Sequence, residues 1–402
     1  MNKESKVLAL KYRPQTFDDL IGQDVVAETI INSIKANKVP NAYLFTGIRG
    51  IGKTTIARIV AKSLNCQNDN GSLCKDNLCE NCEAITNSSH IDVLEMDAAS
   101  KTGVDDVRDL IEFSRYGPTS SKYKIFIIDE VHMLSKQAFN ALLKTLEEPP
   151  EHVKFIFATT EIRKVPVTIL SRCQRFDLQR VQFKILIDHL KWVCEQESIK
   201  FSLEALQIIV RVSGGSVRDA LSLLDQSASI SGDDIKSETI SFMLGLPSRL
   251  SSIEILENIF AGNIANALEI YDNVIINGSN GEILISDMLD IIHLSTRLNV
   301  LGESKEDVSL AIIPEGEKNS ISKISKISIP GLTRAWQILL KGIEEVRSAP
   351  NPDEAGSMVL IRLGYASDLP DPSSLVKKIK SKLEENSNQT DAVLNKSHDK
   401  SN

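Results

Sequence analysis

The feature that most constrains this chain is a phosphate-loop motif at residues 47–54, which read Gly-Ile-Arg-Gly-Ile-Gly-Lys-Thr. Glycines in a G-x-x-x-x-G-K-[ST] loop let the backbone curl so that its N–H groups face a chain of phosphates. An apolar, strand-like run at 42–45 precedes the motif, and a helical pattern with Ile56, Ile59 and Val60 on one face follows it. The N-terminus of such a helix adds positive potential toward a bound phosphate. The segment therefore predicts a strand, a phosphate-binding loop and a helix in succession.

The chemistry of this loop assigns roles to single residues. Lys53 is expected to reach the outer phosphates, and Thr54 to offer its hydroxyl to Mg²⁺. The residues predicted to bind the nucleotide are Gly47, Ile48, Arg49, Gly50, Ile51, Gly52, Lys53, Thr54 and Thr55. A chance match is the alternative, and the strand before the motif and the helix after it make that alternative the weaker one.

A second nucleotide signature is the run at 125–130, where four apolar residues are followed by two acids. It predicts a buried central strand with carboxylates at its C-terminal end, where ligands bind in open α/β sheets. Asp129 is expected to hold the Mg²⁺ shell, and Glu130 to polarise an attacking water. A strand that merely runs into an acidic turn is the alternative, which the phosphate loop upstream disfavours.

Four cysteines, Cys66, Cys74, Cys79 and Cys82, lie close together after the helix that follows the phosphate loop. Four thiolates can close a tetrahedral structural Zn²⁺ site, and Cys79-x-x-Cys82 is a typical spacing for one. The polar and glycine residues around them cannot form a core, so a metal would give this segment a reason to fold. Two alternatives remain: four reduced thiols in a flexible insertion, or a redox pair at Cys79 and Cys82 that leaves the other two unexplained.

Composition sets broad limits. The chain has 402 residues, 42% of them hydrophobic and 25% charged, and a formal net charge of −8. This composition is typical of a globular protein with two or three domains of roughly 150 residues each. The negative charge argues against a surface that is basic all over, but it permits a local basic patch for nucleic acid. We see no apolar run near the ~18 residues of a membrane helix and no signal-peptide pattern, so we expect a cytoplasmic protein.

The pattern of elements changes along the chain. Strand-like runs alternate with helical patterns over residues 1–180, which predicts a parallel sheet with flanking helices. The expected strands are 42–46, 91–96, 124–128 and 154–159. We expect the Cys-rich insertion at 66–82, a small helical domain without strands at 181–243, a larger helical domain at 244–365 and a polar, disordered tail at 366–402. Within the larger helical domain, a polar stretch at 302–328 is expected to form a loop.

Together these motifs resemble the gamma/tau subunit family of the bacterial DNA polymerase III clamp loader, whose members are AAA+ ATPases. The matching segments, in order, are 11–17, 22–23, 47–54, 97–100, 128–134, 140–150, 170–173 and 215–221. The resemblance implies an α/β AAA+ P-loop domain with a zinc-binding insertion, a helical lid domain and an all-α collar domain for oligomerisation. It also implies ATP, Mg²⁺ and Zn²⁺ as cofactors. Its members usually have two residues between the second and third cysteines, whereas four separate Cys74 from Cys79 here.

The resemblance implies further site residues. Arg172, in a Ser-Arg-Cys motif, is expected to act in trans on the ATP of a neighbouring subunit, where a guanidinium offsets transition-state charge; an ordinary surface charge is the alternative. Thr160, or the adjacent Thr159, is expected to be the sensor residue at the end of a strand. The second sensor, which contacts the nucleotide from the lid, would be Arg218.

Residues expected near the adenine are Arg13 and Pro14. Residues expected to contact DNA phosphates without reading sequence are Lys101, Thr102 and Lys144, with solvated surface as the alternative.

The resemblance implies an ATP-driven motor subunit that loads the sliding clamp onto primed DNA during chromosome replication. Its partners would be the delta and delta-prime subunits, further gamma/tau copies, the beta sliding clamp and primer–template DNA, and no membrane. We find no carboxylate arrangement assignable to nucleotidyl transfer, so we expect no polymerase chemistry in this chain. The resemblance nevertheless implies that the chain belongs to a polymerase holoenzyme, which is classed as a transferase and nucleotidyltransferase. The sequence stops soon after the expected collar, so a gamma-like or shortened form is expected.

Three other functions remain open at this point. A delta-prime-like scaffold would share the cysteines and the Ser-Arg-Cys motif, but the intact Lys53-Thr54 and Asp129-Glu130 pairs favour the motor. An AAA+ helicase or remodeller of branched DNA would need no cysteine cluster. A purely structural binding module would need neither nucleotide motif.

Overall fold

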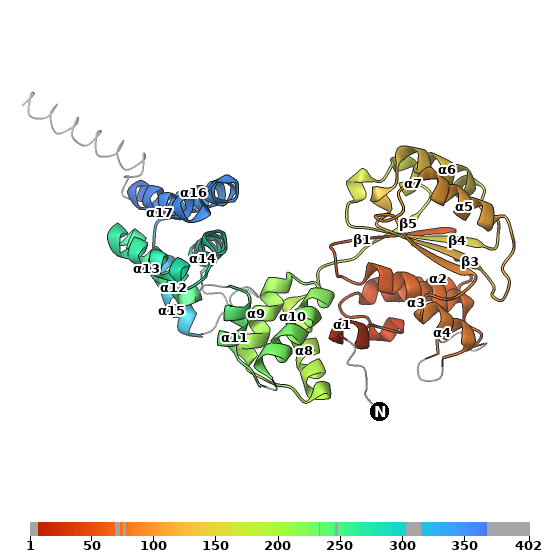
Figure 1. Ribbon diagram of the computed structural model, residues 1–402, viewed down its shortest axis with the longest axis horizontal. Coiled ribbons are helices and arrows are strands. Elements are labelled where there is room, and N and C mark those ends of the chain that lie inside the picture. The colour runs from red at the N-terminus through yellow and green to blue at the C-terminus, as the bar shows by residue number, and fades with distance from the viewer. Residues whose placement is uncertain are drawn as a thin grey trace, which may run out of the picture. The chain divides into compact units, whose positions relative to one another are not determined.

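The computed structural model describes residues 7–68, 73–74, 78–232, 234–245, 248–302 and 315–367. By its contacts the chain divides into two compact units, Met1–Ile240 and Ser241–Asn402. Figure 1 shows that the first contains all of the large sheet and that the second is built from helices. None of the described helices combines the length and the apolar composition that crossing a bilayer requires.

The first unit is organised around a parallel sheet with strand order β2-β3-β4-β1-β5 (Figure 1). Its strands are β1 (Ala42–Thr46), β2 (Val93–Asp97), β3 (Lys124–Asp129), β4 (Val153–Thr159) and β5 (Gln174–Asp177). The sheet confirms the expected fold and the four expected strands. It also adds β5, an edge strand that the sequence did not reveal because only Phe176 of its four residues is buried.

Helices cover both faces of this sheet (Figure 1). They are α2 (Asp24–Lys35), α3 (Lys53–Asn65), α4 (Glu80–Thr86), α5 (Val104–Ser114), α6 (Lys136–Glu147) and α7 (Val167–Leu170), with the 3₁₀ turns η1 (Phe17–Asp19), η2 (Val131–Met133) and η3 (Ile162–Lys164). A further short helix, α1 (Leu8–Lys11), packs instead against the helical remainder of this unit. Alternate strand residues point to opposite faces. Tyr43 and Ile156 therefore pack with α2 and α3, whereas Leu44 and Phe155 pack with α5 and α6.

The remainder of the first unit is mainly helical. Its helices are α8 (Phe183–Glu197), α9 (Leu203–Ser213), α10 (Val217–Ser231) and α11 (Ser237–Met243), the last of which runs across the boundary between the units. Ser202 and Ser216 cap α9 and α10 by accepting backbone N–H hydrogen bonds. The expectation that this region lacks strands was wrong: β6 (Lys200–Phe201) and β7 (Asp234–Ile235) form a parallel pair. Two-residue strands are too short to produce a recognisable alternating pattern.

The described part of the second unit is all helical. Its helices are α12 (Arg249–Phe260), α13 (Ile264–Ile276), α14 (Gly281–Leu301), α15 (Glu315–Ile324), α16 (Ile329–Ser348) and α17 (Pro352–Ser367). The prediction of a loop at 302–328 was wrong for the second half of that segment. There α15 forms and buries Ile321 and Ile324 in the core of this unit. These two isoleucines share one helix face, a signal that the polar composition of the segment concealed. Residues 303–314 and 368–402, which include most of the predicted tail, lie outside the described residues.

The core of the sheet offers a test of the fold. Phe155 is fully buried in β4, and its ring stacks on those of Phe126 and Phe157, with centroids 5.5 Å and 5.8 Å away. Phe155→Ala should leave a cavity and destabilise the first unit by about 3–5 kcal/mol. Differential scanning calorimetry should show this as a lower Tm. Phe242→Ala is the control, because Phe242 is 85% exposed, and an equal shift in both variants would contradict the assigned core.

Candidate functional site

The predicted phosphate loop joins the C-terminal end of β1 to the first residue of α3. Gly50 and Gly52 have φ angles of 76° and 104°, in the left-handed region that favours glycine. A Cβ built on Gly50 would lie 2.1 Å from the hydroxyl oxygen of Ser216, at the start of α10. The loop and the predicted lid therefore approach too closely at this point for any side chain on Gly50.

Lys53 lies inside the curve of this loop and is 6% exposed. Its Nζ donates to the backbone oxygens of Gly47 at 3.1 Å and Ile48 at 2.9 Å. Burial lowers the pKa of Lys53, while the charges of Glu130 and Asp129 act to raise it. A phosphate bound in the loop would give this ammonium a charged partner in place of two neutral carbonyls.

Two residues predicted from separate motifs meet at the end of the sheet. The Thr54 hydroxyl donates to Asp129 Oδ2 at 2.6 Å, and Asp129 Oδ1 accepts the backbone N–H of Glu130 at 2.9 Å. A hydroxyl and a carboxylate are hard oxygen ligands of the kind that Mg²⁺ takes beside substrate phosphates. The donor set therefore fits a Mg²⁺ ion held by Thr54 and Asp129 next to the loop.

Glu130 is positioned by residues at the end of the neighbouring strand β4. It has a φ angle of 47°, an uncommon conformation for a residue other than glycine. Its Oε2 accepts hydrogen bonds from the backbone N–H of Thr160 at 3.1 Å and from the Thr160 hydroxyl at 2.9 Å. Of the two threonines considered from the sequence, Thr160 contacts Glu130, whereas Thr159 lies 3.0 Å from His132 Nδ1.

His132 is a site residue that the sequence reasoning missed. Its side chain is 6% exposed, and Nδ1 lies 3.3 Å from Glu130 Oε2. The ring also faces Glu161, with Nε2 3.6 Å from a carboxylate oxygen. Its place two residues after Glu130, in η2, was the available signal, because the turn brings the ring back onto the strand ends.

Cationic groups gather around the phosphate loop. The Nε of Arg13 donates to the Thr55 hydroxyl at 3.0 Å, and the backbone N–H of Arg218 donates to Gly50 O at 3.2 Å. Burial lowers the pKa of Arg13, and the positive charges of Arg58 and Arg218 lower it further. A bound polyphosphate would offset this crowding of positive charge. The N-terminal segment and the predicted lid thus both contact the loop.

Arg172 follows α7, and its side chain is 32% exposed. Its guanidinium pairs with Glu147 at 2.6 Å and donates to the backbone oxygen of Thr168 at 2.7 Å and to the Ser171 hydroxyl at 3.3 Å. Among the described residues these polar partners all belong to the ends of α6 and α7. A role on a neighbouring subunit's nucleotide therefore stays a prediction.

The three residues predicted to contact DNA are exposed. Lys101 and Thr102 lie in the loop after β2, and Lys144 lies on α6. The backbone oxygen of Thr102 accepts from the N–H of Ser135, the N-cap of α6, at 3.4 Å. This contact brings the loop to the start of α6, and the role in DNA binding stays a prediction.

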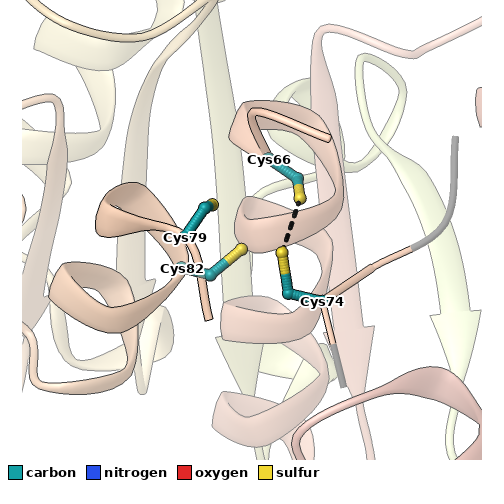
Figure 2. A group of neighbouring side chains, drawn as sticks. All are labelled: Cys66, Cys74, Cys79 and Cys82. Atoms are coloured by element: carbon teal, nitrogen blue, oxygen red, sulfur yellow. Dashed lines mark hydrogen bonds between the residues drawn. The ribbon is translucent and has the colours of Figure 1, made fainter. Parts of the chain in front are cut away.

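The four cysteines form a cluster (Figure 2). The sulfur atoms of Cys66, Cys74, Cys79 and Cys82 all lie within 4.8 Å of one another. In a tetrahedral centre with Zn–S bonds of about 2.3 Å, the sulfurs are about 3.8 Å apart. Cys74 belongs to the cluster despite its longer spacing, with its sulfur 3.5 Å from that of Cys66. The set fits a closed, structural zinc site.

The gathering of four sulfurs, rather than the pKa of any one thiol, favours metal over free thiols. Burial raises the pKa of Cys82. Burial acts to raise the pKa of Cys79, but hydrogen bonds from the backbones of Gln67 and Cys82 and with the side chains of Cys82 and Cys74 together lower it to about 7. Thiolates are the form that binds metal, and a closed set of four gives each cysteine a purpose. A redox pair at Cys79 and Cys82 would leave the placement of the other two unexplained.

Three family models match consecutive parts of the chain. Residues 22–182 match a model described as DNA polymerase III, delta subunit. Residues 186–233 match the DNA polymerase III clamp loader subunit, ATPase lid domain. Residues 235–379 match the DNA polymerase III subunits gamma and tau domain III.

Curated relatives agree with these models. The chain is 37% identical to DNA polymerase III subunit tau of Salmonella typhimurium, over 91% of this chain and 56% of that protein. It is also 37% identical to DNA polymerase III subunit gamma of Buchnera aphidicola subsp. Acyrthosiphon pisum, over 89% of this chain and 98% of that one. The chain thus spans little more than half of the tau protein.

Among solved structures, the chain is similar to the Thermotoga maritima RuvB Holliday junction branch migration motor, with 19% sequence identity and a TM-score of 0.44. The match covers 62% of this chain and 79% of the RuvB chain.

The cysteine cluster predicts bound metal. Elemental analysis of the purified chain should give about one zinc per chain, as a closed four-thiolate site requires. Cys74→Ser should lower the zinc affinity, because it removes one of four ligands. Cys194→Ser is the matched control, since Cys194 is also buried but lies on α8. Zinc retained by Cys74→Ser as tightly as by the unmodified chain would remove Cys74 from the ligand set.

Proposed function

Because the chain belongs to the family of DNA polymerase III gamma and tau subunits, we propose that it is the ATP-driven motor subunit of a clamp loader. In this role it loads a sliding clamp onto primed DNA during chromosome replication in the cytoplasm. The hydrogen bond of 2.6 Å between Thr54 and Asp129 carries the proposal, because it joins the phosphate loop to the acidic strand end in one Mg²⁺-compatible site.

The site residues divide the work of hydrolysis. Lys53 binds the outer phosphates, while Thr54 and Asp129 would hold Mg²⁺, which would neutralise phosphate charge there. Glu130 orients and polarises the attacking water. The hydrogen bonds from Thr160 to Glu130 support a sensor role for Thr160, since a shift of Thr160 would move the Glu130 carboxylate.

The remaining roles concern the lid and the contacts of this chain with other subunits and DNA. We assign Arg172 to the ATP of a neighbouring subunit, and Arg218 to the nucleotide of its own chain from the lid at 181–243. Helices of the region 244–365 would form the collar that joins delta, delta-prime and further gamma/tau copies. The exposed residues Lys101, Thr102 and Lys144 would face primer–template DNA, and the assembled ring would bind the beta sliding clamp.

Two other functions have distinct signatures. A delta-prime-like scaffold would bind its partner subunits without ATP turnover. A remodeller of branched DNA would hydrolyse ATP at a rate indifferent to a sliding clamp. The steady-state ATPase rate of the reconstituted loader, measured with and without primed DNA and clamp, separates these cases, and stimulation by both ligands supports the motor.

Lys53 tests the nucleotide site. Lys53→Ala should lower ATP turnover by about 100-fold or more, because it removes a cation that faces the transferring phosphate. The assay is the steady-state ATPase rate of the assembled loader. Lys35→Ala, at an exposed position on α2, should keep the full rate. Turnover that survives Lys53→Ala would mean that hydrolysis occurs elsewhere in the assembly.

Arg172 tests the proposed action in trans. Arg172→Ala should still bind ATP but should lose about 10³-fold of the turnover stimulated by DNA and clamp, the usual worth of an arginine finger. Binding and turnover should be measured separately on the same loader. Arg175→Ala is the control, because Arg175 is also exposed and also pairs within its own chain, with Asp177 at 2.6 Å. Unchanged turnover in Arg172→Ala would refute the role.

A further inference from the structure

Lys62 is a buried cation that the proposed mechanism does not use. It lies on α3, the helix that begins at the phosphate loop, and it is 2% exposed. Its Nζ donates to Gln15 Oε1 at 2.9 Å and lies 3.5 Å from the Thr86 hydroxyl oxygen. Both of these hydrogen-bond partners are uncharged, although a lysine this buried is ordinarily paired with an anion. The Asp19 carboxylate acts on Lys62 through its charge.

Hydrogen bonds lead from Lys62 to the phosphate loop. Gln15 accepts from Lys62 and also donates from Nε2 to the backbone oxygen of Arg13 at 3.1 Å. Arg13 in turn donates from Nε to the hydroxyl of Thr55 at 3.0 Å. Thr55 follows the magnesium-binding Thr54 directly. Gln15, whose Oε1 also lies 3.4 Å from the Thr86 hydroxyl oxygen, thus links Lys62 to the backbone of Arg13.

A second path leads from Lys62 to the cysteine cluster. Thr86 lies on α4 and donates its hydroxyl to the backbone oxygen of Cys82 at 2.8 Å. Lys62 also lies one helical turn before Cys66, the C-cap of α3. Burial lowers the pKa of Lys62, while the Cys82 and Cys74 sulfurs, when they carry charge, and the Asp19 carboxylate act to raise it.

The charge of a metal centre would complete this arrangement. A zinc ion held by four thiolates carries a net charge of −2. Such a centre would add negative charge to that of the Asp19 carboxylate and would hold the ammonium between α4 and Gln15. Without the negative charge of the metal centre, burial of the Lys62 ammonium is less well compensated.

We propose that Lys62 couples the four-cysteine cluster to the nucleotide site. Metal in the cluster holds Lys62, Lys62 holds Gln15, and Gln15 holds Arg13 against the phosphate loop. Lys62 is thus a positioning residue, and the inference rests on the proposed binding of nucleotide. Because coupling between two binding sites is reciprocal, metal tightens nucleotide binding by the same factor by which nucleotide tightens metal binding.

The coupling can be measured in both directions on the full chain. The dissociation constant of a fluorescent ADP analogue would be determined with zinc-loaded and zinc-free protein. Zinc affinity would be determined by competition with a chromophoric chelator, with and without ADP. We expect zinc to tighten ADP binding by about 5-fold or more, and ADP to tighten zinc binding by the same factor.

Variants locate the coupling. Lys62→Met and Gln15→Leu should still bind about one zinc per chain, as expected while all four thiolates remain, and should bind ADP with an affinity that no longer depends on zinc. Lys62→Arg, which keeps the charge, should restore part of the dependence. Lys154→Met is the matched control, because Lys154, on β4, is also buried, at 5% exposure, and donates to Asn41 Oδ1 at 2.7 Å. Neither residue belongs to the two hydrogen-bond paths from Lys62. The Lys154→Met variant should keep the dependence of the unmodified chain.

Two results would overturn the inference. One is an ADP affinity of the unmodified chain that does not respond to zinc. The other is a full response that persists in both Lys62→Met and Gln15→Leu. Failure of the unmodified chain to bind ADP at all would instead overturn the proposed function, and the inference with it.

Discussion

The parallel direction of the sheet strands is the constraint on which the site depends. Because β1, β3 and β4 run the same way side by side, their C-terminal ends meet at one edge. The phosphate loop follows β1, Asp129 ends β3 and Thr160 follows β4. The hydrogen bonds from Thr54 to Asp129 and from Thr160 to Glu130 are contacts across this edge. An antiparallel pairing would send one of these groups to the opposite end of the sheet.

The N-terminal segment connects parts of the first unit that are distant in sequence. Lys11 and Tyr12 both donate to Glu197 at the end of α8, and the ring of Tyr12 meets Trp192 edge to face. Burial and the neighbouring Glu197 carboxylate raise the pKa of Tyr12 to about 12. The same segment reaches the phosphate loop through Arg13 and the cysteine cluster through Gln15 and Lys62. A short stretch of chain therefore links three functional regions.

Sequence patterns were reliable where one local signal sufficed. The run at 42–45 is continuously apolar because β1 is buried on both faces, and the strand lies at 42–46, where it was expected. The alternating strand pattern was too weak to recognise in β5, where Phe176 is the one buried residue of four. Sequence patterns failed where two well-placed isoleucines, Ile321 and Ile324, outweighed a polar composition and formed α15.

The sequence by itself determined the chemical inventory of this protein: a phosphate loop, an acidic strand end and four cysteines, each readable because its spacing is local. Only the tertiary structure decided which of these groups touch. It brought Cys74 into the cluster despite its spacing, set Thr160 rather than Thr159 against Glu130, and buried Lys62 against Gln15 and Thr86. These contacts join residues far apart in the chain, and no local pattern specifies them, because they depend on how the strands and helices pack.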